Sequence, residues 1–128
     1  MLISKDKIAE LFSILDSLGQ LEAAELLGHF TGENIEAMRR ISGLLKEDHD
    51  LERMWSEKRF VQVVQELFEM RKIWAEKLGE TLTNAAREYD LGNRVQAIWI
   101  LNGFIRFCTS PYYCDIAGEV IGKYEEEQ

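Results

Sequence analysis

The sequence predicts an all-α protein: a five- or six-helix antiparallel bundle with one long central helix and a C-terminal helical hairpin. Apolar residues recur at helical spacing in successive segments. One proline and nine glycines among 128 residues are too few turn formers for a many-stranded sheet. With 46% hydrophobic residues, the chain is long enough to bury its own core. We therefore expect a single helical domain over residues 1–128, with N-terminal helices in 1–47, the long helix in 50–90 and the hairpin in 93–124.

The first helix is expected to begin after Ser4, which can accept a hydrogen bond from the first turn. Gly19 suits the position just past its end. A short second helix over 21–30 follows. The residues expected to face inward from these two helices are Ile8, Leu11, Phe12, Leu15, Leu18, Leu21, Ala24, Leu27 and Phe30.

A third helix is predicted to begin near Glu33 and to leave Arg39 and Arg40 outside. Its inward positions are Ile35, Met38, Ile41, Leu44 and Leu45. Beyond it, Asp50 is a candidate cap for a turn that leads into the next helix.

The long helix is predicted from one unbroken apolar stripe, which passes Gly79, the candidate site of a kink. About 32 residues at 1.5 Å each would span nearly 50 Å. Arg71 falls within the stripe, and we expect its stem to pack on neighbours while the guanidinium reaches water or a glutamate. The stripe consists of Phe60, Val64, Leu67, Trp74, Leu78, Leu82, Ala85 and Tyr89.

The stretch 85–122 is the most apolar part of the chain. Gly92 is expected to take the left-handed backbone that ends helices, and Ser110-Pro111 is a cap followed by proline at the first helical position. The helix between them is expected to be central and to turn Phe104 and Phe107 inward. The last helix should bury Tyr113, Ile116, Ala117, Val120 and Tyr124.

The spacing of seven residues in this stretch resembles that of one tetratricopeptide-type helix pair, in which small and aromatic residues allow close antiparallel packing. The seven residues are Ala86, Tyr89, Gly92, Ala97, Leu101, Phe104 and Pro111. The resemblance implies the geometry of an antiparallel helical hairpin, and neither membership of that family nor its peptide-binding groove.

The net charge of −8 argues against a nucleic-acid binder or a ligand of anionic membranes, because both depend on clustered Lys and Arg. No run approaches the ~20 apolar residues of a membrane helix, and MLISKDK lacks the apolar core of a signal peptide, so a cytoplasmic location is expected. Residues 20–38 contain no Lys or Arg. The acids of this stretch form either a solvated face or a patch for a basic partner: Glu22, Glu25, Glu33 and Glu36.

No motif for catalysis, a cofactor or a metal is evident, so the chain is predicted not to be an enzyme. His29 is interpreted as a helix-end residue, and His49 lies within residues 47–50, whose adjacent side chains cannot all reach one ion. Cys108 and Cys114 lack the partners of a zinc site. They are expected to be small buried thiols, with a disulfide as the alternative.

The functional class that remains is recognition of a partner through the protein surface. Val95 and Trp99 interrupt the polar arc of the helix that follows Gly92, beside Asn102 and Arg106, and Tyr112 could extend this patch. Trp and Arg together are typical of interaction hot spots. The alternative is that the N-terminal helices cover the patch and Trp99 belongs to the core.

These observations favour a non-enzymatic protein–protein interaction or regulatory module, and homo-oligomerisation is plausible because long apolar stripes often need a partner. One alternative is an acidic immunity-type or inhibitor protein that blocks a basic partner. Another is a small-ligand-binding bundle with a pocket lined by Trp74, Trp99, Phe104 and tyrosines. A weaker hypothesis is nucleic-acid binding through Arg39, Arg40, Arg53, Lys58 and Arg59.

Overall fold

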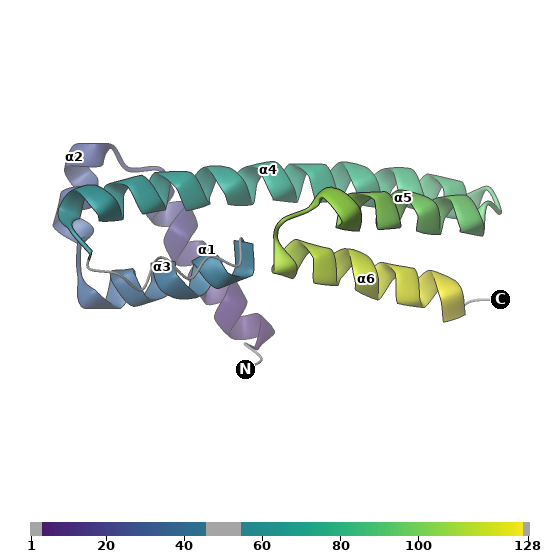
Figure 1. Cartoon of the computed structure of the whole chain (residues 1–128), viewed down its shortest axis with the longest axis horizontal. Helices are drawn as coiled ribbons and strands as arrows, with labels where there is room; N and C mark the ends of the chain where they lie inside the picture. The colour runs from purple at the N-terminus through teal and green to yellow at the C-terminus, as the bar shows by residue number, and fades with distance from the viewer. Residues whose placement is uncertain (1–3, 46–54, 127–128) are drawn as a thin grey trace. The chain divides into compact units, whose positions relative to one another are not determined.

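The computed structural model describes residues 4–45 and 55–126, and every regular element in these ranges is a helix. This confirms the all-α class with a long helix and a C-terminal hairpin (Figure 1). None of the described helices combines the length and the apolar character needed to cross a membrane. In order they are α1 (Lys5–Gly19), α2 (Ala23–Leu26), a 3-10 turn (Leu27–His29), α3 (Gly32–Leu45), α4 (Glu57–Asp90), α5 (Arg94–Phe107) and α6 (Pro111–Glu126).

The chain divides into two compact units, residues 1–71 and 72–128, and the boundary falls within α4. The single domain stays a prediction. Helix α4 continues through Gly79 without interruption. Its first turn is capped by Ser56, whose Oγ accepts the Arg59 N–H at 3.1 Å. The candidate cap Asp50 lies outside the described residues.

The first unit buries the apolar faces of α1, α3 and the beginning of α4 against one another. Ser4 caps α1 as predicted, because its Oγ accepts the Lys7 N–H at 3.2 Å. Leu26, not Leu27, is the buried leucine of α2. The prediction was wrong there because α2 is one short turn that tightens into a 3-10 helix, so a steady helical period does not apply. The core of this unit consists of Leu11, Phe12, Leu15, Leu18, Leu26, Ala37, Met38, Ile41, Leu45, Phe60, Val63, Val64 and Leu67.

Gly19 has a different role from the predicted one. It is the last residue of α1, and Gln20 after it keeps a right-handed backbone with φ −86°. A Cβ at Gly19 would overlap the side chain of Phe68 on α4. The glycine is therefore required by the close approach of α1 to α4 and not by a left-handed turn.

Arg71 joins α1 and α4 in the same unit. Its Nε donates to Oδ1 of Asp16 and its NH2 group donates to Oδ2, both at 2.9 Å. The guanidinium also lies 4.2 Å from the ring centroid of Phe12. The partner is thus an aspartate, where water or a glutamate was expected, and the two-pronged geometry fixes the orientation of both side chains.

In the second unit, the end of α4, α5 and α6 run in alternating directions (Figure 1). Gly92 has φ 86°, and its N–H donates to the Tyr89 carbonyl while the Asn93 N–H donates to the Glu88 carbonyl. This pair of bonds is the Schellman motif, so the predicted helix end is confirmed. Ser110 caps α6 as predicted, because its Oγ accepts the Tyr113 N–H at 3.3 Å.

The core of the second unit lies on the inner sides of these three helices. Trp74 and Phe104 meet edge to face at 5.9 Å, and Tyr89 stacks on Tyr124 at 4.2 Å between ring centroids. The inward assignment of Phe107 was wrong, because this side chain is 76% exposed. Phe107 lies about 60° around α5 from Phe104, away from the remaining buried residues. The most deeply buried are Leu78, Ala85, Ala97, Leu101, Phe104, Tyr113 and Ala117.

We predict that Gly19→Ala lowers the free energy of unfolding by about 1–3 kcal/mol, because the added methyl group overlaps Phe68. Gly43→Ala is the matched control. Gly43 lies within α3 with open space around it, so the same change should raise the stability by up to about 1 kcal/mol. Urea denaturation measures both. Equal effects of the two substitutions would contradict the close approach of α1 and α4.

Two fully buried serines lead to opposite expectations. Ser42 Oγ has no hydrogen-bond partner in the structure described, whereas Ser110 Oγ caps α6. Ser42→Ala should raise the free energy of unfolding by about 1 kcal/mol, because an unsatisfied buried hydroxyl is removed. Ser110→Ala should lower it by about 1 kcal/mol, because a cap is lost. Thermal denaturation compares them, and a loss of stability in Ser42→Ala would show that its hydroxyl is paired.

Candidate functional site

The candidate site is the outer side of α5, made by Val95, Trp99, Asn102 and Arg106, and we call these four residues the α5 face. They are spaced four, three and four residues apart, which places them within an arc of about 60° on one helix. All four are exposed, with Val95 at 82% and Trp99 at 69%. The structure thus brings four of the five predicted residues together on one accessible surface.

The opposite side of α5 holds this helix in place. Ala97, Leu101 and Phe104 are buried, and α5 packs along α6. Trp74 of α4 contacts Phe104 edge to face. The α5 face is therefore presented by a helix whose other side is fixed by packing, which limits the entropy lost when a partner binds.

The fifth predicted residue, Tyr112, lies in the first turn of α6 and is half-buried. Its ring packs against that of Tyr113, with 4.9 Å between centroids and an angle of 77°. Part of its surface is therefore used within α6. Its contribution to an interaction surface stays a prediction.

Two apolar residues near the α5 face were missed at the sequence level. Leu91 is 69% exposed in the turn before α5, and Phe107 ends the helix. The signal for Leu91 was its position between Asp90 and Gly92, where a turn leaves a side chain little to pack against. Four of the six exposed large hydrophobic residues in the described ranges fall between Leu91 and Phe107.

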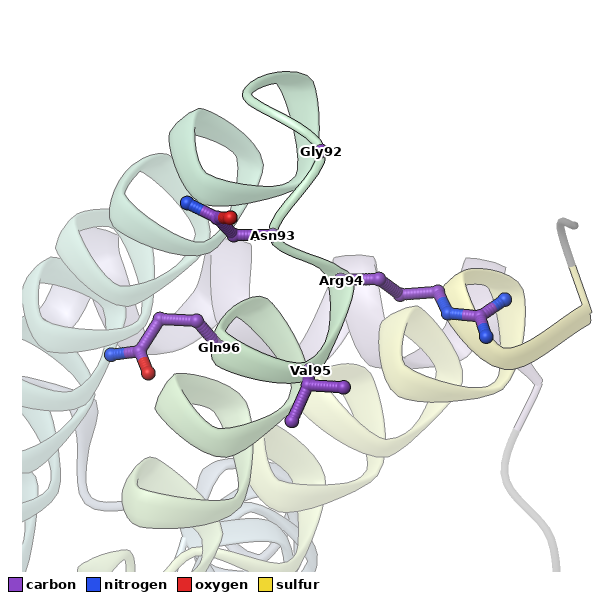
Figure 2. Close-up of a pocket in the computed structure, with 5 residues that line it drawn as sticks. All are labelled: Gly92, Asn93, Arg94, Val95 and Gln96. Atoms are coloured by element: carbon purple, nitrogen blue, oxygen red, sulfur yellow. The ribbon is translucent and has the colours of Figure 1, made fainter.

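The charges on α5 are all positive, because the helix contains Arg94 and Arg106 and no acid. Arg106 is exposed and makes no ion pair within the described ranges. At the other end, the α4–α5 turn forms a shallow depression lined by Gly92, Asn93, Arg94, Val95 and Gln96. Figure 2 shows Arg94 and Gln96 extending to opposite sides of the start of α5, with Val95 between them.

The remaining polar candidates have local structural roles. Cys108 and Cys114 are free and half-buried: the Cys114 thiol donates to the Cys108 carbonyl at 3.5 Å, and Cys108 Sγ accepts the Ser110 N–H at 3.4 Å. His29 is exposed at the end of the 3-10 turn, and its carbonyl accepts from Asn34. His49 lies outside the described residues. Within them, no group of three or more side chains is placed to hold a metal ion.

The acidic residues of the stretch 20–38 also make local contacts. Glu22 and Glu25 form the capping box of α2. Glu36 pairs with Arg39 at 3.7 Å and with Arg40 at 3.5 Å, so these two arginines face an acid on their own helix. Of the other cations proposed for nucleic-acid binding, Arg53 lies outside the described residues.

The aromatics proposed to line a ligand pocket are separated by α5. Phe104 is buried against Trp74, whereas Trp99 lies about 140° away around the helix and is exposed. Trp99 and Phe104 therefore do not face one cavity. No protein-family model, curated protein or solved structure matches this chain.

The two sides of α5 should respond differently to truncation. Trp99→Ala should change the free energy of unfolding by no more than about 0.5 kcal/mol, because its side chain is largely in water. Phe104→Ala should lower it by about 3 kcal/mol, because a buried ring and its contact with Trp74 are lost. Chemical denaturation at low protein concentration measures both, and a loss of several kcal/mol for Trp99→Ala would show that Trp99 belongs to the core.

Proposed function

We propose that this chain is a non-enzymatic protein–protein interaction module that binds its partner through the α5 face. The supporting observation is the exposure of Trp99 next to Val95 and Arg106 on a helix that is packed on its other side. Tryptophan and arginine dominate the binding energy of protein interfaces more often than other residues do. A Trp ring that is 69% exposed gains a large apolar burial when a partner covers it.

The distribution of exposed apolar residues supports the same proposal. Single exposed hydrophobic side chains are common, but a local concentration indicates an interaction surface. Leu91, Val95, Trp99 and Phe107 lie within 17 consecutive positions, on one helix and the turn before it. Exposed apolar residues at this density favour aggregation unless another surface covers them. A binding partner that covers them accounts for their presence.

The inhibitor-type alternative has less support. It depends on the acids of residues 20–38, and Glu22, Glu25 and Glu36 already serve as caps or ion-pair partners. A cytoplasmic location belongs to our proposal and is supported by the two free cysteines, Cys108 and Cys114, since free thiols are typical of reducing compartments.

Photo-cross-linking in cells tests the proposed function. A benzophenone amino acid in place of Trp99 should give a discrete adduct, and the same group in place of the exposed Glu119 of α6 should not. Adding Val95→Asp to the position-99 protein should abolish the adduct, because a charge is placed in the apolar contact. Equal labelling from positions 99 and 119, or an adduct that survives Val95→Asp, would contradict binding through the α5 face.

A further inference from the structure

We propose that the partner of the α5 face is a second copy of this chain, whose α5 lies antiparallel to the first across a twofold axis between Trp99 and Asn102. This inference rests on the proposed function and names its partner. Three features of the described residues support it: the spacing of the face, the chemistry of the pairs that the axis creates, and the charges at the two ends.

The spacing is symmetric. The intervals of four, three and four residues read the same in both directions, and their midpoint lies between Trp99 and Asn102. Alternating intervals of three and four are those of a helix–helix seam. A twofold interface requires that each residue and its counterpart exchange places in the two copies. The α5 face meets this condition, with Val95 opposite Arg106 and Trp99 opposite Asn102.

The resulting pairs are chemically compatible. The indole N–H of Trp99 is a donor and the side-chain oxygen of Asn102 is an acceptor, and neither side chain has a hydrogen bond within the described ranges. The twofold axis provides this pair twice. Val95 meets the aliphatic stem of Arg106, which packs on apolar surface while its guanidinium stays in water. The ring of Trp99 is covered while its indole N–H keeps a hydrogen-bond acceptor.

The charges at the two ends of α5 favour an antiparallel over a parallel pair of α5 helices. A parallel pair would place Arg106 against Arg106 of the second copy and Arg94 against Arg94, which is repulsive. In the antiparallel pair, Arg106 reaches the end of the second α5 where α4 finishes at Asp90. Asp90 is exposed and, like Arg106, makes no ion pair in the part of the chain described. The two unpaired charges therefore become complementary across the interface.

The small size of the surface indicates a weak and reversible interface. A standard interface buries about 800 Å² per partner, and four side chains of one helix supply less than that. Leu91 lies in the turn before the face and is exposed, so it adds apolar area where α5 of the second copy ends. We therefore expect a reversible dimer with a dissociation constant on the order of 10–100 μM.

Sedimentation velocity of the full chain from about 1 to 500 μM tests this dimer. Wild type should pass from monomer to dimer over this range. Arg106→Glu and Asp90→Arg should each weaken association by about tenfold or more, because each places like charges together. The double variant Arg106→Glu/Asp90→Arg restores opposite charges and should return within about threefold of wild type. Lys123→Glu, a charge reversal at an exposed position of α6, should have no effect.

Circular dichroism of every variant checks that the helices are retained. A wild type that stays monomeric at about 500 μM would overturn the second copy as partner. A dimer that Arg106→Glu leaves unchanged, or that the double variant does not restore, would overturn the antiparallel α5 pair. The photo-cross-link at position 99 distinguishes failure of the dimer from failure of the proposed function. An adduct with a different protein would support the interaction module and reject the dimer. The absence of any adduct, together with a monomeric wild type, would reject the interaction module and the dimer.

Discussion

The structure depends on covering the apolar stripe of α4. A 34-residue helix gains little stability from its own hydrogen bonds in water and needs packing along one side. In the first unit, Phe60, Val64 and Leu67 of this stripe are buried, the ring of Phe30 packs on Phe60, and contacts at Gly19 and Asp16 fix α1 against α4. In the second unit, Leu78 and Ala85 are buried, and Phe104 of α5 and Tyr124 of α6 pack on aromatic rings of α4.

The candidate site follows from the way in which the second unit meets this requirement. Helix α5 is apolar over more of its circumference than α4 and α6 can cover. Ala97, Leu101 and Phe104 are used against those helices, which leaves Val95 and Trp99 in water. Polar residues would suffice at these two positions for folding alone. Their exposure on a fixed helix is therefore the observation that supports a binding role for this surface, and the opposite charges of Arg106 and Asp90 give the proposed dimer its direction.

Sequence reasoning predicted the features that depend on local chemistry. Gly92 and Ser110-Pro111 were identified because a left-handed helix end and a capped first turn need particular residue types. Features that depend on neighbours distant in sequence were not identified. The role of Gly19 requires Phe68 to be adjacent, and the exposure of Phe107 depends on where α6 lies. The spacing of the α5 face could be read from the sequence, but whether another helix covers Trp99 could not.

The accessibility of Trp99 as a function of protein concentration tests the account most directly. In a variant with Trp55→Phe and Trp74→Phe, Trp99 is the sole tryptophan, and acrylamide quenching reports its exposure. We predict strong quenching at about 1 μM, where the α5 face is in water, and protection at about 500 μM, where a second copy covers it. Protection at about 1 μM in a sample that sediments as a monomer would show that the chain covers its own α5 face. Strong quenching at every concentration would show that no second copy binds there.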